Sequence, residues 1–177
     1  MFHRSERLLL RPAWPEDWQA VHNGIADEGV VRNLARAPWP YRPDDAQQFV
    51  ALPQDHLHPR FLVTRARDAV MVGCIGLDPC DDGVELGYWI ARPYWGRGYA
   101  TEAAHGVLGI ARMLRHKLIN ASHFLDNPAS GKVLAKLGFK PTGKVAARFS
   151  CGRSEKALAA EYVLDLEQAD IPVQQAA

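Results

Sequence analysis

The hydrophobic pattern is most regular between residues 100 and 114, where apolar side chains recur at the spacing of one helix face. The positions of this stripe are Ala100, Ala103, Ala104, Val107, Leu108, Ala111 and Leu114. Before it, residues 84–90 form a short apolar run that follows Asp81-Asp82-Gly83, a sequence typical of a hairpin turn. The pattern predicts a hairpin strand that is followed by a long amphipathic helix.

The rest of the chain continues this mixture of strands and helices. Further strands are expected at residues 7–11, 61–66, 70–77, 116–124, from 139 onward and at 156–166, and further helices from 15, at 27–34, 44–52 and 128–137. This order predicts a mixed α/β domain whose central sheet is partly antiparallel at the hairpins. We expect the domain to span residues 1–166 and to be followed by a loose tail, residues 167–177, which is polar and contains a proline.

Composition excludes several functions. The 177 residues include 21 basic and 20 acidic side chains, which give a net charge of +1. Nucleic-acid and anionic-membrane surfaces need a basic excess on one face, so neither partner is expected. No apolar run approaches the roughly 20 residues of a membrane-spanning helix. The three cysteines, Cys74, Cys80 and Cys151, match no metal or redox spacing, and their odd number argues against a disulfide framework, so we expect a cytoplasmic protein without a metal.

A glycine-rich segment, Trp95-Gly96-Arg97-Gly98-Tyr99-Ala100-Thr101-Glu102, joins the predicted strand to the long helix. Glycines let a backbone approach a ligand, and the first amides of a helix have no internal partners and lie at the positive end of its dipole. The segment is therefore a candidate phosphate or pyrophosphate site, although a tight strand-to-helix connection explains it equally well. It lacks the Gly-Lys-Ser/Thr ending of a nucleoside-triphosphate loop, and Thr101 stands where a dinucleotide fold has its third glycine.

Four phrases in order resemble the GNAT superfamily of N-acetyltransferases, and more narrowly its ribosomal-protein-alanine acetyltransferase branch (RimJ/RimL-like). They are Glu6-Arg7-Leu8-Leu9-Leu10-Arg11-Pro12, Glu85-Leu86-Gly87-Tyr88-Trp89-Ile90, Tyr94 to Ala103, and Asn127 to Phe139 with Asn127-Pro128-Ala129-Ser130 at its start. The resemblance implies a GNAT-like α/β (α+β) fold, with a mixed, mostly antiparallel sheet of about six to seven strands, helices on both faces and splayed central strands. It also implies an enzyme that moves acetyl from acetyl-CoA to a primary amine.

The resemblance places the coenzyme on the glycine turn and on the strand before it. Family members hold the pyrophosphate with main-chain amides of the turn, and the pantetheine arm pairs with the strand. The implied contacts are Tyr88, Trp89, Ile90, Gly96, Arg97, Gly98, Tyr99, Ala100, Thr101, Asn127 and Ser130. Trp95 replaces the Gln or Arg that opens the family's turn, which removes a polar side chain but none of the amides. Arg97 could attract a phosphate or be solvated, and Asn127 could contact the coenzyme or serve only as a helix cap.

Three residues are candidates for the reaction itself. The amide of Tyr88 would face the thioester carbonyl and stabilise the negative charge that develops there. Ser130 is the family-matched donor of a proton to the leaving thiolate, and its alternative is a hydrogen bond within the first helical turn. Glu85 could accept the amine proton, directly or through water, or could pair with an arginine at the sheet edge. Arg148 stands where some ribosomal-protein members carry a glutamate base, which weakens the transfer of that mechanism and of that substrate.

The acceptor is expected to contact Trp39, Tyr41 and Arg148. An equally good explanation of the two aromatic side chains is that they simply cover the sheet. At pH 7, neutralising a lysine amine of pKa near 10.4 costs about 4.6 kcal/mol, whereas an α-amine of pKa near 8 costs about 1.4 kcal/mol. If Glu85 is the sole, partly solvated base, this difference favours a peptide N-terminus or an α-amino compound over a lysine. The expected reaction is direct attack by a peptide N-terminus or a small amine in a ternary complex. Two alternatives stay open: a non-catalytic domain that senses acyl-CoA, and a detoxifying acetyltransferase of a foreign amine. The chain is expected to be a monomer or a homodimer.

Overall fold

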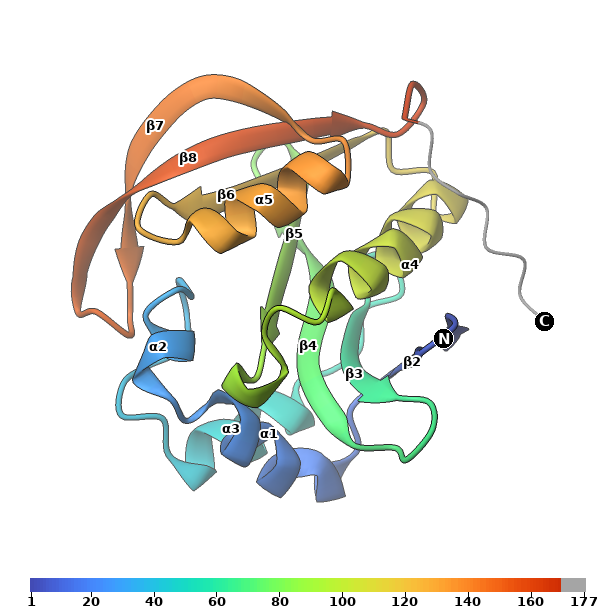
Figure 1. Cartoon of the computed structure of the whole chain (residues 1–177), viewed down its shortest axis with the longest axis vertical. Coiled ribbons are helices and arrows are strands. Elements are labelled where there is room, and N and C mark those ends of the chain that lie inside the picture. The colour runs from blue at the N-terminus through green and yellow to red at the C-terminus, as the bar shows by residue number, and fades with distance from the viewer. Residues whose placement is uncertain (170–177) are drawn as a thin grey trace.

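The computed structural model describes residues 1–169, which form an eight-stranded sheet with helices on both faces (Figure 1). The strands are β1 (His3–Arg4), β2 (Leu8–Arg11), β3 (Arg60–Arg65), β4 (Met71–Cys80), β5 (Gly83–Ile90), β6 (Leu118–Phe124), β7 (Lys140–Ser150) and β8 (Glu155–Asp165). Their order in the sheet is β1-β2-β3-β4-β5-β6-β8-β7. The predicted mixed, mostly antiparallel sheet is confirmed, with one strand more than the six to seven expected, because the two-residue β1 is too short to show a pattern.

Two groups of helices cover the two faces of the sheet. The helices are α1 (Trp18–Ile25), α2 (Glu28–Val31), α3 (Pro43–Ala51), α4 (Tyr99–Met113) and α5 (Pro128–Lys136), with short 3-10 turns at Pro15–Asp17 and Arg92–Tyr94. One core joins α4 and α5 to the sheet, and a second core joins α1, α2 and α3 to it. Side chains on β3 alternate between the two, since Phe61 and Val63 belong to the first core and Leu62 to the second.

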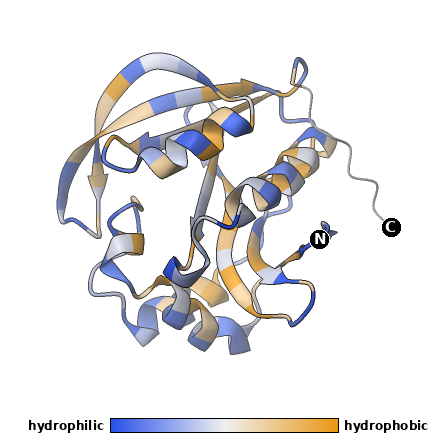
Figure 2. Ribbon diagram, viewed as in Figure 1, coloured by the Kyte–Doolittle hydropathy of each residue, from blue (hydrophilic) through white to orange (hydrophobic). Residues whose placement is uncertain are grey.

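The central strand β4 is buried on both faces. Every residue from Met71 to Leu77 is buried, and Figure 2 shows β4 as a mostly hydrophobic strand. Strands that are covered on both faces have continuous apolar runs instead of alternating ones. The long apolar run at 70–77 is therefore explained by helices on both sides.

Strands β5 and β6 are the one parallel pair in the described sheet, and they pair only at Val84–Ile119 and Glu85–Asn120. Beyond this point β5 continues to Ile90, while β6 follows β8 as far as Phe124. The two strands therefore diverge, which confirms the expected splay. The edge of β5 from residue 86 onward has no strand beside it on this side.

The described end of the chain lies against α4. Arg112 donates hydrogen bonds to the main-chain carbonyls of Leu166 (2.7 Å) and Ala169 (2.5 Å), and Lys117 forms an ion pair with Glu167. The remainder of the tail that was expected to be loose, residues 170–177, lies outside the described residues. Within residues 1–169, no helix is long and apolar enough to span a membrane, and no cluster of His, Cys, Asp and Glu is suited to a metal ion.

Candidate active site

The glycine turn lies at the N-terminus of α4, as the sequence predicts. Gly96 and Gly98 have φ angles of +72° and +78°, left-handed values that glycine adopts without strain, and Gly98 is the residue before the helix. No side chain caps α4, and within the described chain the main-chain amides of residues 96–101 donate no hydrogen bond to protein. A side-chain carbon at Gly96 would meet nothing within 4 Å. Free amides in open space at a helix N-terminus form a site suited to a phosphate group.

A network of hydrogen bonds around Glu102 fixes this turn to the segment before β2. The carboxylate of Glu102 accepts hydrogen bonds from Ser5 Oγ (2.6 Å), the Arg7 amide (2.9 Å) and Arg7 Nε (2.7 Å). Arg7 Nη1 in turn donates to the carbonyl of Arg97 at 3.1 Å. Burial by itself would raise the pKa of Glu102, but the hydrogen bonds from Ser5 and Arg7 and the charge of Arg7 lower it. An ionised Glu102 therefore holds the turn in place.

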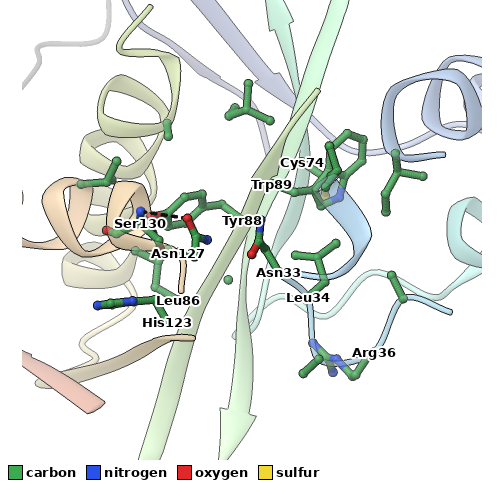
Figure 3. A pocket seen from close by; sticks show the side chains of 18 of the residues that line it. Asn33, Leu34, Arg36, Cys74, Leu86, Tyr88, Trp89, His123, Asn127 and Ser130 are labelled. Atoms are coloured by element: carbon green, nitrogen blue, oxygen red, sulfur yellow. Dashed lines mark hydrogen bonds between the residues drawn. The ribbon is translucent and has the colours of Figure 1, made fainter. Parts of the chain in front are cut away.

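Helix α5 brings Ser130 to β5. The side chain of Asn127 accepts a hydrogen bond from the Ser130 amide at 3.4 Å, which is the predicted capping role. The hydroxyl of Tyr88 lies 2.8 Å from that of Ser130, and Figure 3 shows the Tyr88 side chain pointing towards α5. Burial raises the pKa of Tyr88 to about 12, so its hydroxyl stays protonated at neutral pH. Tyr88 can therefore donate to Ser130 and leave the Ser130 proton free for another acceptor.

A cavity of about 1400 Å³ occupies the splay and extends from α4 and α5 to α2 and α3. Its lining contains most of the residues expected at the site: Tyr41, Glu85, Tyr88, Trp89, Ile90, Gly96, Gly98, Tyr99, Ala100, Thr101, Asn127, Ser130 and Arg148. Arg97 and Trp39 are not part of this lining. The guanidinium of Arg97 lies 5.7 Å from the Tyr94 ring centroid, and Trp39 is 39% exposed. The structure therefore brings the glycine turn and the expected acceptor region to one continuous space.

Glu85 is held in an ion pair with Arg148. Arg148 Nη1 lies 2.5 Å from Glu85 Oε1 and Nη2 lies 3.0 Å from Oε2, and Ser122 Oγ donates to Glu85 at 2.9 Å. Burial alone would raise the pKa of Glu85, but the hydrogen bond and charge of Arg148, with help from Ser122, lower it. A carboxylate with a lowered pKa accepts a proton poorly at neutral pH. Of the two roles considered for Glu85, the geometry favours the ion pair.

The turn between β7 and β8 is bound to the segment that follows α2. Ser150 Oγ donates to the Leu34 carbonyl at 2.7 Å, and the Cys151 amide donates to the Ala35 carbonyl at 2.8 Å. Figure 1 shows this end of the hairpin reaching down beside α2. These contacts fix β7, and therefore Arg148, over the splay.

The lining also contains residues that local sequence patterns did not single out as site residues, among them Arg36, Cys74, Gly87 and His123. Figure 3 shows Cys74 and Trp89 on one side of β5, and His123 with Ser130 on the other. Burial raises the pKa of Cys74 to about 12, so it is an uncharged thiol. The one usable signal was Gly87, because a glycine inside a strand often marks a close approach. The contacts of Arg36 and His123 depend on distant elements and leave no mark in local sequence.

A splayed sheet with an open glycine turn beside it defines an acyl-CoA-dependent transferase, and comparison with known proteins identifies the family. The acetyltransferase (GNAT) domain matches residues 7–140, so the chain belongs to this family, whose members are acyltransferases that use acetyl-CoA. Over 144 residues it is 29% identical to the uncharacterised N-acetyltransferase YnaD of Bacillus subtilis (strain 168), covering 78% of this chain and 82% of that protein.

Solved structures agree with this assignment. A GNAT-family acetyltransferase from Bacillus anthracis is similar with a TM-score of 0.82 and 25% identity, over 95% of this chain and 100% of that chain. RimL, a ribosomal L7/L12 alpha-N-protein acetyltransferase in complex with coenzyme A, is similar with a TM-score of 0.77 and 18% identity, over 93% of this chain and 98% of that chain. The second likeness is one of fold.

Proposed function

We propose that this protein transfers the acetyl group of acetyl-CoA to a primary amine, on a small molecule or at a peptide N-terminus, by direct attack in a ternary complex. The observation that carries the proposal is one continuous cavity that joins the free amides of the glycine turn to the α2–α3 side of the sheet. Two substrates that enter from these two sides meet at β5.

The residues present fit acetyl-CoA. The amides of residues 96–101 suit its diphosphate, and Lys132 and Lys136 of α5 add positive charge to the lining. When bound, acetyl-CoA supplies an acetyl group that is activated as a thioester. Ser130 lies on the same helix as these lysines, and Asn127 is the N-cap of that helix.

Alternation along β5 decides which main-chain groups face the splay. The Ala91 amide donates to the Val72 carbonyl on β4, and the indole of Trp95 donates to the Ile90 carbonyl at 2.6 Å. Since neighbouring residues of a strand direct their amides to opposite edges, the amides of Tyr88 and Ile90 point to the open edge. This supports Tyr88 as the donor to the developing negative charge. Trp89, by the same alternation, directs its main chain to β4 and contributes its side chain to the cavity.

The surroundings of the Ser130 hydroxyl and of the Glu85 carboxylate indicate which of the two groups can transfer a proton. The C–N bond forms as the C–S bond breaks, the amine loses one proton and the departing sulfur gains one. Ser130, held by Tyr88, is the group placed to protonate the sulfur. Glu85 is tied to Arg148, so we assign it a positioning role and infer that the amine proton leaves to solvent. This supports an acceptor amine of modest pKa over a lysine side chain.

A thiol-release assay with acetyl-CoA and a panel of primary amines tests this function, with coenzyme A affinity measured in parallel by calorimetry. We expect turnover with at least one amine and intersecting initial-rate lines when both substrates are varied. Tight coenzyme binding without turnover across the panel would overturn the proposal in favour of an acyl-CoA sensor.

A further inference from the structure

The α1–α3 side of the β4–β5 hairpin forms a floor of three successive cross-strand pairs. Their order is Cys74–Trp89, Gly76–Gly87 and Asp78–Glu85. Side chains of directly opposed residues lie on the same face, so an apolar pair and an acidic pair are separated by two glycines without side chains. All six residues line the cavity. The floor therefore has an apolar end, a bare middle and a charged end.

Packing explains only one of the two glycines. A side-chain carbon at Gly76 would lie 3.0 Å from the Pro59 carbonyl oxygen and 3.1 Å from Arg60 Cα. These distances are shorter than ordinary van der Waals contacts, and the atoms belong to the backbone at the start of β3, so Gly76 is required by packing. At Gly87 the nearest atom would be Asp78 Oδ2 at 3.7 Å, an ordinary contact. Gly87 is also absent from the glycines with positive φ. A glycine weakens a strand interior, and one that neither packing nor conformation requires marks a place where a ligand approaches the backbone.

Two arginines balance the charged end of the floor. Arg36, from the segment after α2, pairs with Asp78, and Arg148, from β7, pairs with Glu85. A guanidinium has five N–H donors, and in residues 1–169 the Nε of Arg148 and one Nη2 hydrogen have no protein acceptor. The Arg148 side chain is 37% exposed. Glu85 and Ser122 therefore hold a guanidinium that still has donors to offer to a further acceptor.

From this floor, and on the basis of the proposed function, we propose that the acceptor is a small primary amine that itself carries a carboxylate. Its carboxylate binds Arg148, its backbone lies over Gly87, and its apolar part contacts Cys74 and Trp89. A carboxylate matches the planar guanidinium in two-point hydrogen bonding. A polyamine has no group for either arginine, and a peptide N-terminus has lost the carboxylate next to its amine.

Acceptors that differ in one group provide the test. Phenylalanine, phenylalaninamide and phenethylamine share the aromatic ring and differ in the carboxylate, and a short peptide that begins with phenylalanine represents the N-terminal alternative. We expect kcat/KM, corrected for the fraction of neutral amine, to be at least about tenfold higher for phenylalanine than for the other three, as expected for loss of a charged hydrogen-bond pair. Equal or higher values for the amide, the amine or the peptide overturn the inference and leave the acetyltransferase function intact. No turnover with any amine, despite coenzyme binding, overturns the function itself.

Variants of the floor separate a binding role from a structural one. The double variant Glu85→Gln/Arg148→Gln keeps a neutral pair and avoids an unpaired carboxylate, and it should abolish the preference for phenylalanine over phenethylamine. Gly87→Val should raise KM for phenylalanine, with Gly87→Ala intermediate, while the Kd for coenzyme A stays within error and the melting temperature does not fall, because valine suits a strand interior better than glycine. An unchanged preference in the double variant, or an unchanged KM in Gly87→Val, contradicts the proposal.

Discussion

The hydroxyl of Tyr88 on β5 lies 2.8 Å from the hydroxyl of Ser130 on α5, so the two sides of the splay meet at a pair of side-chain oxygens. Tyr88 is mostly buried and its pKa is raised to about 12, which keeps its proton on the phenol. Ser130 is further held through its amide by Asn127. In the proposed reaction, this pair holds the hydroxyl proton that Ser130 gives to the leaving sulfur.

We expect Ser130→Ala to lower kcat by about 100-fold, at the lower end of general acid catalysis, with KM for acetyl-CoA within about twofold. Tyr88→Phe should lower kcat less, because Ser130 keeps its own proton and its bond to Asn127. Steady-state kinetics at saturating amine checks both values. A Ser130→Ala enzyme with full kcat would remove Ser130 from the reaction.

Gly98 should be the most sensitive position of the turn. A side chain at its φ of +78° costs about 1–2 kcal/mol, and Gly98→Trp should abolish coenzyme A binding altogether. Gly109→Ala is the matched control, since it lies in α4, has open space around it and should keep the affinity of the parent. Calorimetry with coenzyme A measures both variants, and normal binding by Gly98→Trp would mean that the turn is misassigned.

The pH dependence of kcat/KM should follow the pKa of the acceptor amine and not the pKa of Glu85. The folded pKa of Glu85 is lowered from its ordinary value of 4.5, so this carboxylate stays ionised throughout the range from pH 5.5 to 8.5 and cannot produce a limb there. We expect the acid limb to move when an amine of different pKa is used, and to persist in Glu85→Gln. A limb that stays fixed across amines and disappears in Glu85→Gln would identify Glu85 as the base.

Glu102 should contribute to stability in a pH-dependent way. Because its folded pKa is lowered below 4.5, its contribution is present above that pH and is lost as pH falls through the folded value. Glu102→Gln should therefore cost about 1–2 kcal/mol at pH 7, less near pH 3, and weaken coenzyme A binding, because Arg7 no longer holds the turn as firmly.

Urea unfolding at pH 7, 5 and 3.5 measures this effect. Glu6→Gln, at an exposed position just before the Arg7 contact, is the control and should match the parent at each pH. If Glu102→Gln lowers the free energy of unfolding by the same amount at all three pH values, the stabilisation does not depend on the ionised form of Glu102.

Local patterns were enough to predict most of the fold, the glycine turn before α4 and the start of α5. The glycine spacing before the stripe at 100–114 predicts α4 and its open N-terminus, and Asn127 before Pro128 predicts the start of α5, because turns and caps are decided by neighbouring residues. The resemblance supplied the splay. Neither source could show that β8 lies between β6 and β7, since strand order depends on contacts between distant segments.

The acceptor side of the cavity was harder to predict, because it too depends on contacts between distant segments. Glu85 and Arg148 are 63 residues apart, and their pairing requires the β7–β8 turn to be tied to residues 34 and 35. The sequence offered Trp39 and Tyr41 together, but only Tyr41 lines the cavity, because neighbours in a connector face different directions. A glycine inside the predicted strand at 84–90 can be noticed in the sequence. Its meaning for the cavity becomes clear only when the structure shows that Gly76 lies opposite Gly87.

A crystal structure of the protein with coenzyme A bound tests most directly whether the glycine turn and β5 bind the coenzyme. We expect the diphosphate within hydrogen-bonding distance of the amides of residues 96–101, and the pantetheine arm along the open edge of β5 with the sulfur near Ser130. A diphosphate bound elsewhere, or an arm that does not follow β5, would show that the coenzyme site is misassigned.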